Sequence, residues 1–216
     1  MKSIEQIAKK INQKIKKWAQ QDSKLIIAID GYAGSGKTSV TNRIAELNSS
    51  CLIIHLDDFI KPWQVRKQML DTARDQSKVF EYKWYRYNTV ERLVKRFLSV
   101  NTGHIRLKVY DFGKNKFIAS RVFNLSKNIL IIEGIFLLHP LHKRNTFWQK
   151  RIFLNTDLKK ADNRKIAEIR QKFGAKWSPK DHPDSYLSYF HEVYIQYLNH
   201  YHPEQKADLI INVDAE

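Results

Sequence analysis

A glycine-rich stretch directly after an apolar run is the feature that most constrains the fold of this chain. The run is Leu25–Ile29, and Asp30–Thr38 follows it with the pattern Gly-x-x-x-x-Gly-Lys-Thr. Beyond the stretch, Val40, Ile44 and Leu47 recur at the spacing of one helix face. A strand, a glycine-rich turn and a helix in this order predict a phosphate-binding loop, whose backbone N–H groups line an anion-sized hollow. The alternative is a glycine-rich turn that matches the pattern by chance.

The residues of this loop predict the binding of a nucleoside triphosphate. Lys37 is placed to reach the β- and γ-phosphates, and the hydroxyl of Thr38 suits Mg²⁺. The following helix adds the positive end of its dipole and its unpaired N–H groups. The predicted nucleotide-binding residues are Gly31, Tyr32, Ala33, Gly34, Ser35, Gly36, Lys37 and Thr38.

Two further apolar runs end in carboxylates. Asp57 and Asp58 follow Cys51–Leu56, and Glu133 follows Asn128–Ile132. Such nearly continuous runs suit strands buried on both faces of a parallel sheet, and these sheets carry their chemistry at the carboxyl ends of the strands. We therefore expect Glu133 to help hold Mg²⁺, and Asp57, before Asp58, to receive a hydroxyl proton. A helix N-cap or a surface turn is the alternative for the two aspartates.

The alternation of apolar runs and helical patterns predicts an α/β fold with three layers and a mostly parallel sheet. We expect a single domain over residues 1–216, with residues 1–24 forming an amphipathic helix packed on it. A basic amphipathic helix on a membrane surface is the alternative for that segment. Ile105–Phe112 and Lys116–Phe123 predict a small β-excursion from the main sheet.

Composition excludes several classes of protein. The single cysteine, Cys51, rules out an intramolecular disulfide, and the lack of cysteine clusters argues against a structural zinc site. No apolar stretch has the length of a membrane span, and we expect no secretory signal, so a cytoplasmic setting follows. We interpret the net charge of +16 as a basic surface with a phosphate-attracting cleft rather than as nucleic-acid recognition. A homo-oligomer is compatible with the sequence.

A basic set lies on the predicted helix Leu158–Arg170 and could close over the phosphates as a lid. It contains Arg164, Lys165 and Arg170. Guanidinium groups are permanently charged and rigid, which suits them to stabilising a transferred phosphoryl group. The alternative is a solvated helix face.

Together these residues resemble the uridine kinase-like group of phosphate-loop kinases, which includes uridine–cytidine kinases, nicotinamide riboside kinases and phosphoribulokinases. The resemblance is carried by Gly31–Thr38, His55–Pro62, Val109–Phe112, Ile132–Gly134, Asn163–Arg170 and Ala207–Ile211. It implies ATP as the donor with Mg²⁺, Asp57 as the catalytic residue of its segment, and Tyr110 as a nucleoside contact. It also implies a metal-site role for Glu133 and an arginine-bearing lid in which Arg164 and Arg170 are catalytic.

The resemblance extends to the acceptor side with three departures. Glu81 falls near the segment whose carboxylate binds ribose hydroxyls in uridine kinases. Asp57–Pro62 reads Asp-Asp-Phe-Ile-Lys-Pro, which is closer to nicotinamide riboside kinases than to uridine kinases. Asn115 stands where uridine kinases have a base-contacting histidine, and Glu168 stands where a lid arginine is expected.

The sequence therefore predicts an ATP-dependent small-molecule kinase that acts on a nucleoside, with the 5′-hydroxyl of uridine or cytidine as the leading acceptor. Asp57 and Asp58, with Glu81 and Tyr110, are the predicted substrate-binding residues. One alternative keeps the mechanism and changes the acceptor to nicotinamide riboside, another ribosyl compound or a sugar phosphate. A second alternative, raised by the net charge, is a nucleic-acid-binding ATPase or a polynucleotide kinase.

Overall fold

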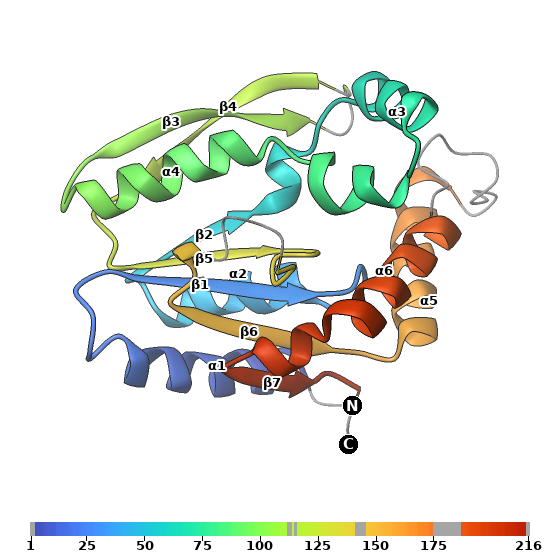
Figure 1. The fold of residues 1–216 in the computed structure, drawn as a ribbon. Coiled ribbons are helices and arrows are strands. Elements are labelled where there is room, and N and C mark those ends of the chain that lie inside the picture. The colour runs from blue at the N-terminus through green and yellow to red at the C-terminus, as the bar shows by residue number, and fades with distance from the viewer. Residues whose placement is uncertain (1–2, 112–113, 115, 141–145, 175–186, 215–216) are drawn as a thin grey trace.

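The computed structural model describes residues 3–111, 114, 116–140, 146–174 and 187–214 (Figure 1). No helix in this described part of the chain is long and apolar enough to cross a bilayer. The helices are α1 (Ile4–Trp18), α2 (Lys37–Leu47), α3 (Trp63–Thr72), α4 (Tyr87–Ser99), α5 (Leu158–Phe173) and α6 (Leu187–Tyr201), with the short turns η1 (Leu56–Phe59), η2 (Val79–Lys83) and η4 (Pro203–Lys206). The strands are β1 (Leu25–Gly31), β2 (Cys51–His55), β3 (His104–Asp111), β4 (Lys116–Asn124), β5 (Ile129–Gly134), β6 (Lys150–Asn155) and β7 (Leu209–Asn212).

The predicted α/β fold with a mostly parallel sheet is confirmed. Five strands form a sheet in the order β2-β5-β1-β6-β7, and each neighbouring pair is parallel. β3 and β4 form a separate antiparallel pair, which is the predicted β-excursion. Figure 1 shows this hairpin lying along α4, away from the five-stranded sheet. The strands β1, β2 and β5 are neighbours, so the segments that follow them emerge at the same edge.

Side chains of β1 alternate between two hydrophobic cores on the two faces of the sheet. Leu25, Ile27 and Ile29 belong to a core that also contains residues of α1 and α2. Ile26 and Ala28 belong to the other core, which includes residues of η1, η2, α4, the β3–β4 hairpin and α6. This alternation follows from the two-residue period of a strand, and it produces the three predicted layers.

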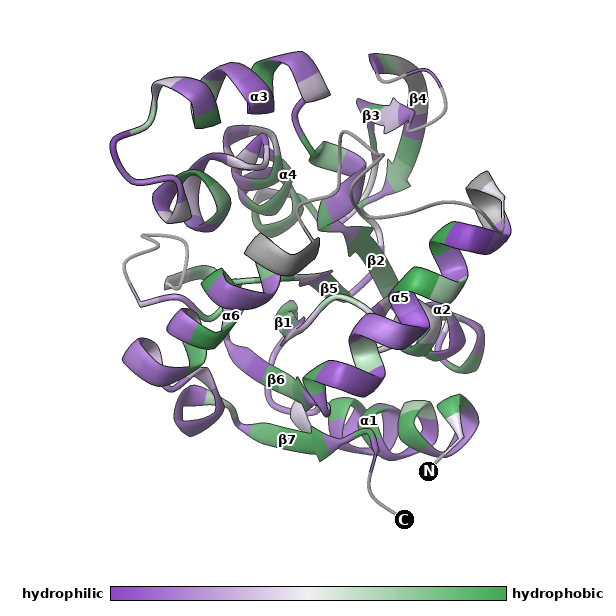
Figure 2. Ribbon diagram, turned by 90° about the vertical axis from the view of Figure 1, so that its right-hand side faces the viewer, coloured by the Kyte–Doolittle hydropathy of each residue, from purple (hydrophilic) through white to green (hydrophobic). Residues whose placement is uncertain are grey.

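The N-terminal amphipathic helix ends at Trp18 rather than at residue 24. Its start is fixed by a capping box, in which Ser3 and Gln6 bond to each other's backbone N–H groups. An ion pair between Glu5 and Arg43 joins α1 to α2. In Figure 2 the strands β2 and β7 are mostly green, whereas α5 and α6 carry much purple, as expected for helices with one face in solvent. Ile7, Ile11 and Ile15 of α1 are buried, whereas Ile4 in its first turn is exposed.

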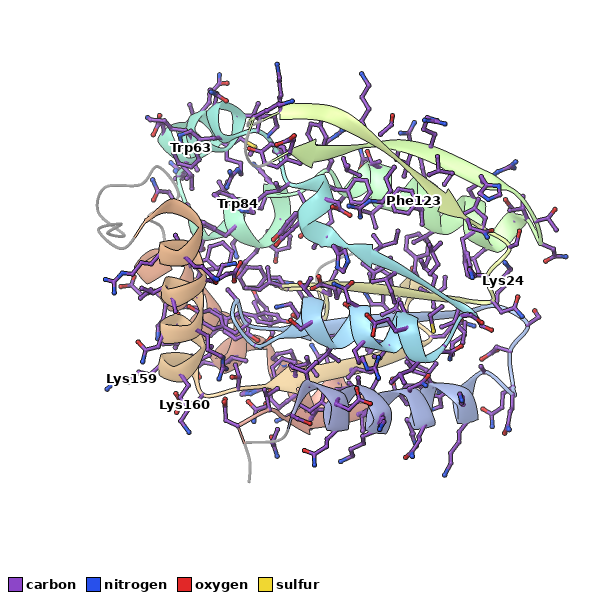
Figure 3. The ribbon with its side chains drawn as sticks, turned by 180° about the vertical axis from the view of Figure 1, so that it is seen from behind. Lys24, Trp63, Trp84, Phe123, Lys159 and Lys160 are labelled. Carbon is purple, nitrogen blue, oxygen red and sulfur yellow. The ribbon has the colours of Figure 1, made fainter. Side chains whose placement is uncertain are left out.

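The aromatic-rich residues 79–87 lie between α3 and the first residue of α4 and include the π-helical turn η2. Phe80 stacks on Trp84 with ring centroids 4.3 Å apart. The guanidinium of Arg66 lies 4.7 Å from the Trp84 ring and 5.3 Å from the Trp63 ring, and Figure 3 shows the two tryptophans at the same end of the molecule. Aromatic packing thus fixes this segment.

Candidate active site

The glycine-rich loop between β1 and α2 closes over its own lysine. Gly34 and Gly36 have φ values of 74° and 85°, a left-handed conformation that glycine adopts at no steric cost. Lys37 begins α2, and its Nζ donates hydrogen bonds to the carbonyl oxygens of Gly31 and Tyr32 at 2.8 and 2.7 Å. The ammonium group is thereby held within the loop, where phosphates would bind.

The parallel register brings the predicted metal-site residues into direct contact. His55, the last residue of β2, pairs with Glu133 of β5. The Oε1 atom of Glu133 accepts a hydrogen bond from Thr38 Oγ1 at 2.9 Å and lies 2.8 Å from His55 Nδ1. A hydroxyl from the start of α2 and a carboxylate from β5 therefore face the same point beside the loop.

Glu133 and Asp57 have pKa values that the protein pushes in opposite directions. Burial alone would raise the pKa of Glu133, but the hydrogen bond from His55 and the charge of Lys37 lower it. Asp57 is exposed to solvent, yet the protein around its carboxylate displaces enough water to raise its pKa, and repulsion from Glu133 adds to this. Such a separation marks different acid–base roles: Glu133 stays ionised, and Asp57 becomes the better proton acceptor.

Asp57 lies in η1, and a buried tyrosine orients it. The Tyr85 hydroxyl donates a hydrogen bond to Asp57 Oδ1 at 3.1 Å. The backbones around the two residues are also joined, because Ile60 pairs with Tyr85 and the N–H of Arg86 donates to the carbonyl of Phe59 at 2.8 Å. Asp57 Oδ1 is therefore fixed by the tyrosine, and the carboxylate retains acceptor capacity for a substrate hydroxyl.

The residues at this site fit Mg²⁺ that is held partly by a nucleotide. Mg²⁺ prefers oxygen ligands and usually keeps several waters, bound through one or two protein groups plus substrate phosphates. Thr38 and Glu133 supply a hydroxyl and an ionised carboxylate that already touch. Within the described ranges, no group of three or more His, Cys, Asp or Glu residues forms a separate metal site.

Of the predicted lid residues, Arg164 is engaged by the protein itself. Its Nε donates to the carbonyl of Gly34 at 2.8 Å, its Nη1 to Asp214 Oδ1 at 2.8 Å and its Nη2 to Thr156 Oγ1 at 2.6 Å. The guanidinium thus joins the glycine-rich loop to the segments that follow β6 and β7. A direct catalytic role for Arg164 remains a prediction.

The charge of Lys165, the next residue of α5, reaches the centre of the site. It lowers the pKa of both Asp57 and Lys37. Its Nζ lies 3.1 and 3.2 Å from the two carboxylate oxygens of Glu168, the residue that stands where a lid arginine was expected. Arg170 lies farther along α5 and is exposed, and its catalytic role also remains a prediction.

The predicted acceptor residues are placed differently from one another. Asp58 forms an ion pair with Arg121 of β4, and burial raises the pKa of Asp58 against the attraction of that arginine. Tyr110 is buried on β3 with its ring centroid 5.6 Å from that of Phe117. Asp58 therefore links η1 to the hairpin. The predicted departure at Asn115 lies outside the described residues.

Glu81 is buried in η2. Its Oε2 lies 3.6 Å from His139 Nε2 and 3.7 Å from Lys78 Nζ, and this oxygen has no hydrogen-bond partner among the described residues. The side chains near this oxygen of Glu81 are therefore His139 and Lys78. Its role as a sugar ligand stays a prediction.

Comparison with known proteins identifies the family. Residues 26–213 match the model of the "Phosphoribulokinase / Uridine kinase family". The chain belongs to this family. A uridine kinase of Clostridium novyi is 28% identical over 194 residues, which cover 87% of this chain and 86% of that protein. Nicotinamide riboside kinase 2 of Mus musculus is 27% identical over 143 residues, 66% of this chain and 67% of that protein.

Other relatives match over a smaller part of their length. The match to uridine-cytidine kinase C of Dictyostelium discoideum covers 24% of that protein at 29% identity, and 55% of this chain. Among solved structures, a possible uridine kinase from Bacillus stearothermophilus has a TM-score of 0.65 at 17% identity, covering 94% of this chain and all of that one. This structural likeness supports the phosphate-loop kinase fold.

Within this kinase fold, three site residues were missed by sequence reasoning. Tyr85 is one aromatic residue among several in residues 79–87, and Arg121 is one basic residue among many. Neither had a local signal that could mark it. His55 had one, because it is a polar residue near the end of the apolar run Cys51–Leu56. Glu133 follows another such run, and the ends of parallel strands meet at one edge of a sheet.

Proposed function

We propose that this protein is an ATP- and Mg²⁺-dependent kinase that transfers the γ-phosphoryl group to a hydroxyl of a nucleoside, with the 5′-hydroxyl of uridine or cytidine as the leading acceptor. The observation that carries the proposal is the contact between Thr38 and Glu133 beside the loop that holds Lys37. The opposite pKa shifts of Asp57 and Glu133 agree with it. Membership of a family whose relatives include uridine kinases supports it. A cytoplasmic setting and a single catalytic domain are part of the proposal.

In the proposed reaction, Asp57 takes the proton of the acceptor hydroxyl. The new bond forms between that oxygen and the γ-phosphorus, and the bond to the bridging oxygen breaks to release ADP. Tyr85 holds one oxygen of the Asp57 carboxylate, which orients the other toward the acceptor. The raised pKa of Asp57 improves it as a base at neutral pH.

Positive charge from two elements would offset the charge on the transferred group. Lys37 exchanges the carbonyl oxygens of Gly31 and Tyr32 for phosphate oxygens, and Lys165 approaches from α5. Mg²⁺ bound by Thr38 and Glu133 would neutralise part of the phosphate charge. Charge stabilisation of this kind is the main protein contribution to phosphoryl transfer.

The test is a panel of nucleosides, ribosyl pyridines and pentose phosphates incubated with ATP and Mg²⁺, followed by product analysis. Uridine or cytidine 5′-monophosphate is the expected product. Asp57→Asn should lower kcat by about 10²- to 10⁴-fold and leave the affinity for a non-hydrolysable ATP analogue near that of the wild type. Asp22→Asn, an exposed aspartate outside the site, is the matched control. Near-wild-type turnover by Asp57→Asn would show that the base is misassigned.

Nicotinamide riboside is the second candidate acceptor, and a specific observation favours it. The segment Asp57–Pro62 resembles nicotinamide riboside kinases, and one relative is nicotinamide riboside kinase 2 of Mus musculus. Both candidates present a ribose 5′-hydroxyl, so the reaction at Asp57 is the same for each. The ratio of kcat/KM for uridine and nicotinamide riboside decides between them.

A further inference from the structure

The second residue of the glycine-rich loop makes a polar contact that phosphate binding does not require. The Tyr32 side chain is fully buried. Its hydroxyl donates a hydrogen bond to Asp162 Oδ1 of α5 at 2.8 Å. The other oxygen of Asp162 lies 2.7 Å from His191 Nδ1 of α6, and that nitrogen lies 3.4 Å from the Tyr32 hydroxyl. Three elements therefore meet at one partly buried carboxylate.

Each member of this cluster depends on the others. An ionised carboxylate only accepts hydrogen bonds, so both Tyr32 and the Nδ1–H of His191 donate to Asp162. A buried phenol hydroxyl without a partner is costly, which ties Tyr32 to the carboxylate. The Tyr32 ring also packs against Tyr194 of α6 with centroids 4.7 Å apart. In Figure 2, α6 and α5 stand on either side of the end of β1.

The same loop touches α5 at a second point through its backbone. A Cβ atom placed on Gly34 would lie 2.3 Å from the carbonyl oxygen of Ala161, so only glycine fits there. Arg164, one turn after Ala161, donates to the carbonyl of Gly34. The residues Ala161, Asp162 and Arg164 thus hold the loop from one helix.

From these contacts we infer that Asp162 and His191 are positioning residues for the nucleotide donor, which act on the glycine-rich loop through Tyr32. The loop contacts the phosphates both in the bound nucleotide and in the transition state. Loss of the cluster therefore weakens ATP binding and changes kcat less. The inference rests on the proposed function only for the identity of the donor, because the cluster acts on the glycine-rich loop.

The test measures the affinity for a non-hydrolysable ATP analogue with Mg²⁺ by calorimetry, together with KM for ATP and kcat. Tyr32→Phe keeps the ring packing and removes the hydroxyl, and Asp162→Ala removes the acceptor. Each variant should weaken analogue binding by about five- to tenfold. The double variant should bind about as weakly as Asp162→Ala alone, because both changes break the same link. His191→Gln should weaken binding less than Asp162→Ala.

Controls separate positioning from general destabilisation. Asn163→Ala, an exposed neighbour on α5, should leave binding unchanged. Asp162→Asn keeps the side-chain volume and an acceptor oxygen, so it should bind the analogue more tightly than Asp162→Ala. It also keeps the test valid if Asp162→Ala folds poorly. Wild-type affinity in both Tyr32→Phe and Asp162→Asn would overturn the inference, as would losses that add fully in the double variant. If the analogue binds while no acceptor is phosphorylated, the proposed function fails and this inference is still decided by the affinities.

Discussion

The two halves of the candidate site are built in different ways. The donor half comprises Gly31–Thr38 and Glu133, and the register of three parallel strands brings these residues together. The acceptor half comprises Asp57 and Asp58 with Tyr85 and Arg121. There, single side chains 28 and 63 residues away in the sequence contact the two aspartates.

The difference teaches where catalysis and specificity reside. A sheet register is set by many backbone hydrogen bonds and resists local change, so the donor half follows from the fold itself. Side-chain contacts outside the sheet can be exchanged one at a time. Family membership therefore predicts the reaction type well, whereas the acceptor depends on residues that the fold does not dictate.

After Asp57→Asn, the largest effect should come from Glu133→Gln in the donor half. The variant loses the ionised carboxylate that faces Thr38 and His55, so charge compensation at the phosphates weakens. We expect kcat to fall by about 10²- to 10³-fold and the Mg²⁺ concentration for half-maximal rate to rise, with little change in KM for the acceptor. Glu192→Gln, an exposed glutamate of α6, is the control. Unchanged Mg²⁺ dependence would remove Glu133 from the donor half.

An effect about ten times smaller should follow from Tyr85→Phe in the acceptor half. The hydroxyl of Tyr85 lowers the pKa of Asp57, although burial keeps it above the ordinary value of 3.8. The base must be deprotonated to act, so kcat/KM falls when acidification protonates Asp57. This fall occurs at a pH above 3.8, because the pKa of Asp57 is raised. Removing the hydroxyl raises the pKa further, so the acidic limb moves to higher pH and kcat/KM drops about tenfold. A matching rise in KM for ATP would show that the two halves are not separable.

Arg121→Ala should have a smaller effect, confined to the acceptor. The substitution frees Asp58 from its ion pair and loosens the link between η1 and the hairpin. KM for the acceptor should change by about two- to fivefold, because Arg121 is half exposed and such pairs are modest in energy. Steady-state kinetics at saturating ATP measure this change, with Lys108→Ala on β3 as the control. An equal effect of both variants would indicate loss of surface charge rather than of a specific contact.

The smallest effect should come from Asp214→Asn, which supports the donor half from outside. Burial opposes ionisation of Asp214, but hydrogen bonds from Arg164 and Thr156 lower its pKa to about 2. A lowered carboxylate pKa adds stability above the unfolded value, and this contribution is lost as pH falls from about 4 toward 2. We expect the variant to lose about 1 kcal/mol at neutral pH, or about 2–4 °C in Tm. Thermal unfolding at pH 7 and pH 3 should show a smaller difference at the lower pH.

Much of the fold and of the donor half could be predicted because the signals are local. The apolar runs of β1, β2 and β5 and the glycine pattern each lie within one short segment. Parallel pairing then places the strand ends together, so the contact between Thr38 and Glu133 followed from fold class.

The remaining site residues could not be predicted because their partners are distant or unusual. The contacts of Arg164 with Gly34 and Asp214 join segments far apart in the sequence, and its lid role stays a prediction. Glu168 pairs with Lys165. In the sequence, this pair cannot be distinguished from charged residues on a solvated helix face. The π-helical turn η2 has no sequence period of its own. Burial of Tyr32 likewise depends on two helices more than a hundred residues away.

The alternation of β1 side chains between two cores has an evolutionary consequence. Leu25, Ile27 and Ile29 anchor the helices beneath the phosphate-binding loop, whereas Ile26 and Ala28 support η1, η2 and the hairpin. Substitutions that reshape the acceptor half can therefore accumulate on one side of a single strand while the opposite side stays unchanged. A lineage can in this way acquire a new substrate through a series of intermediates that all keep an intact nucleotide site.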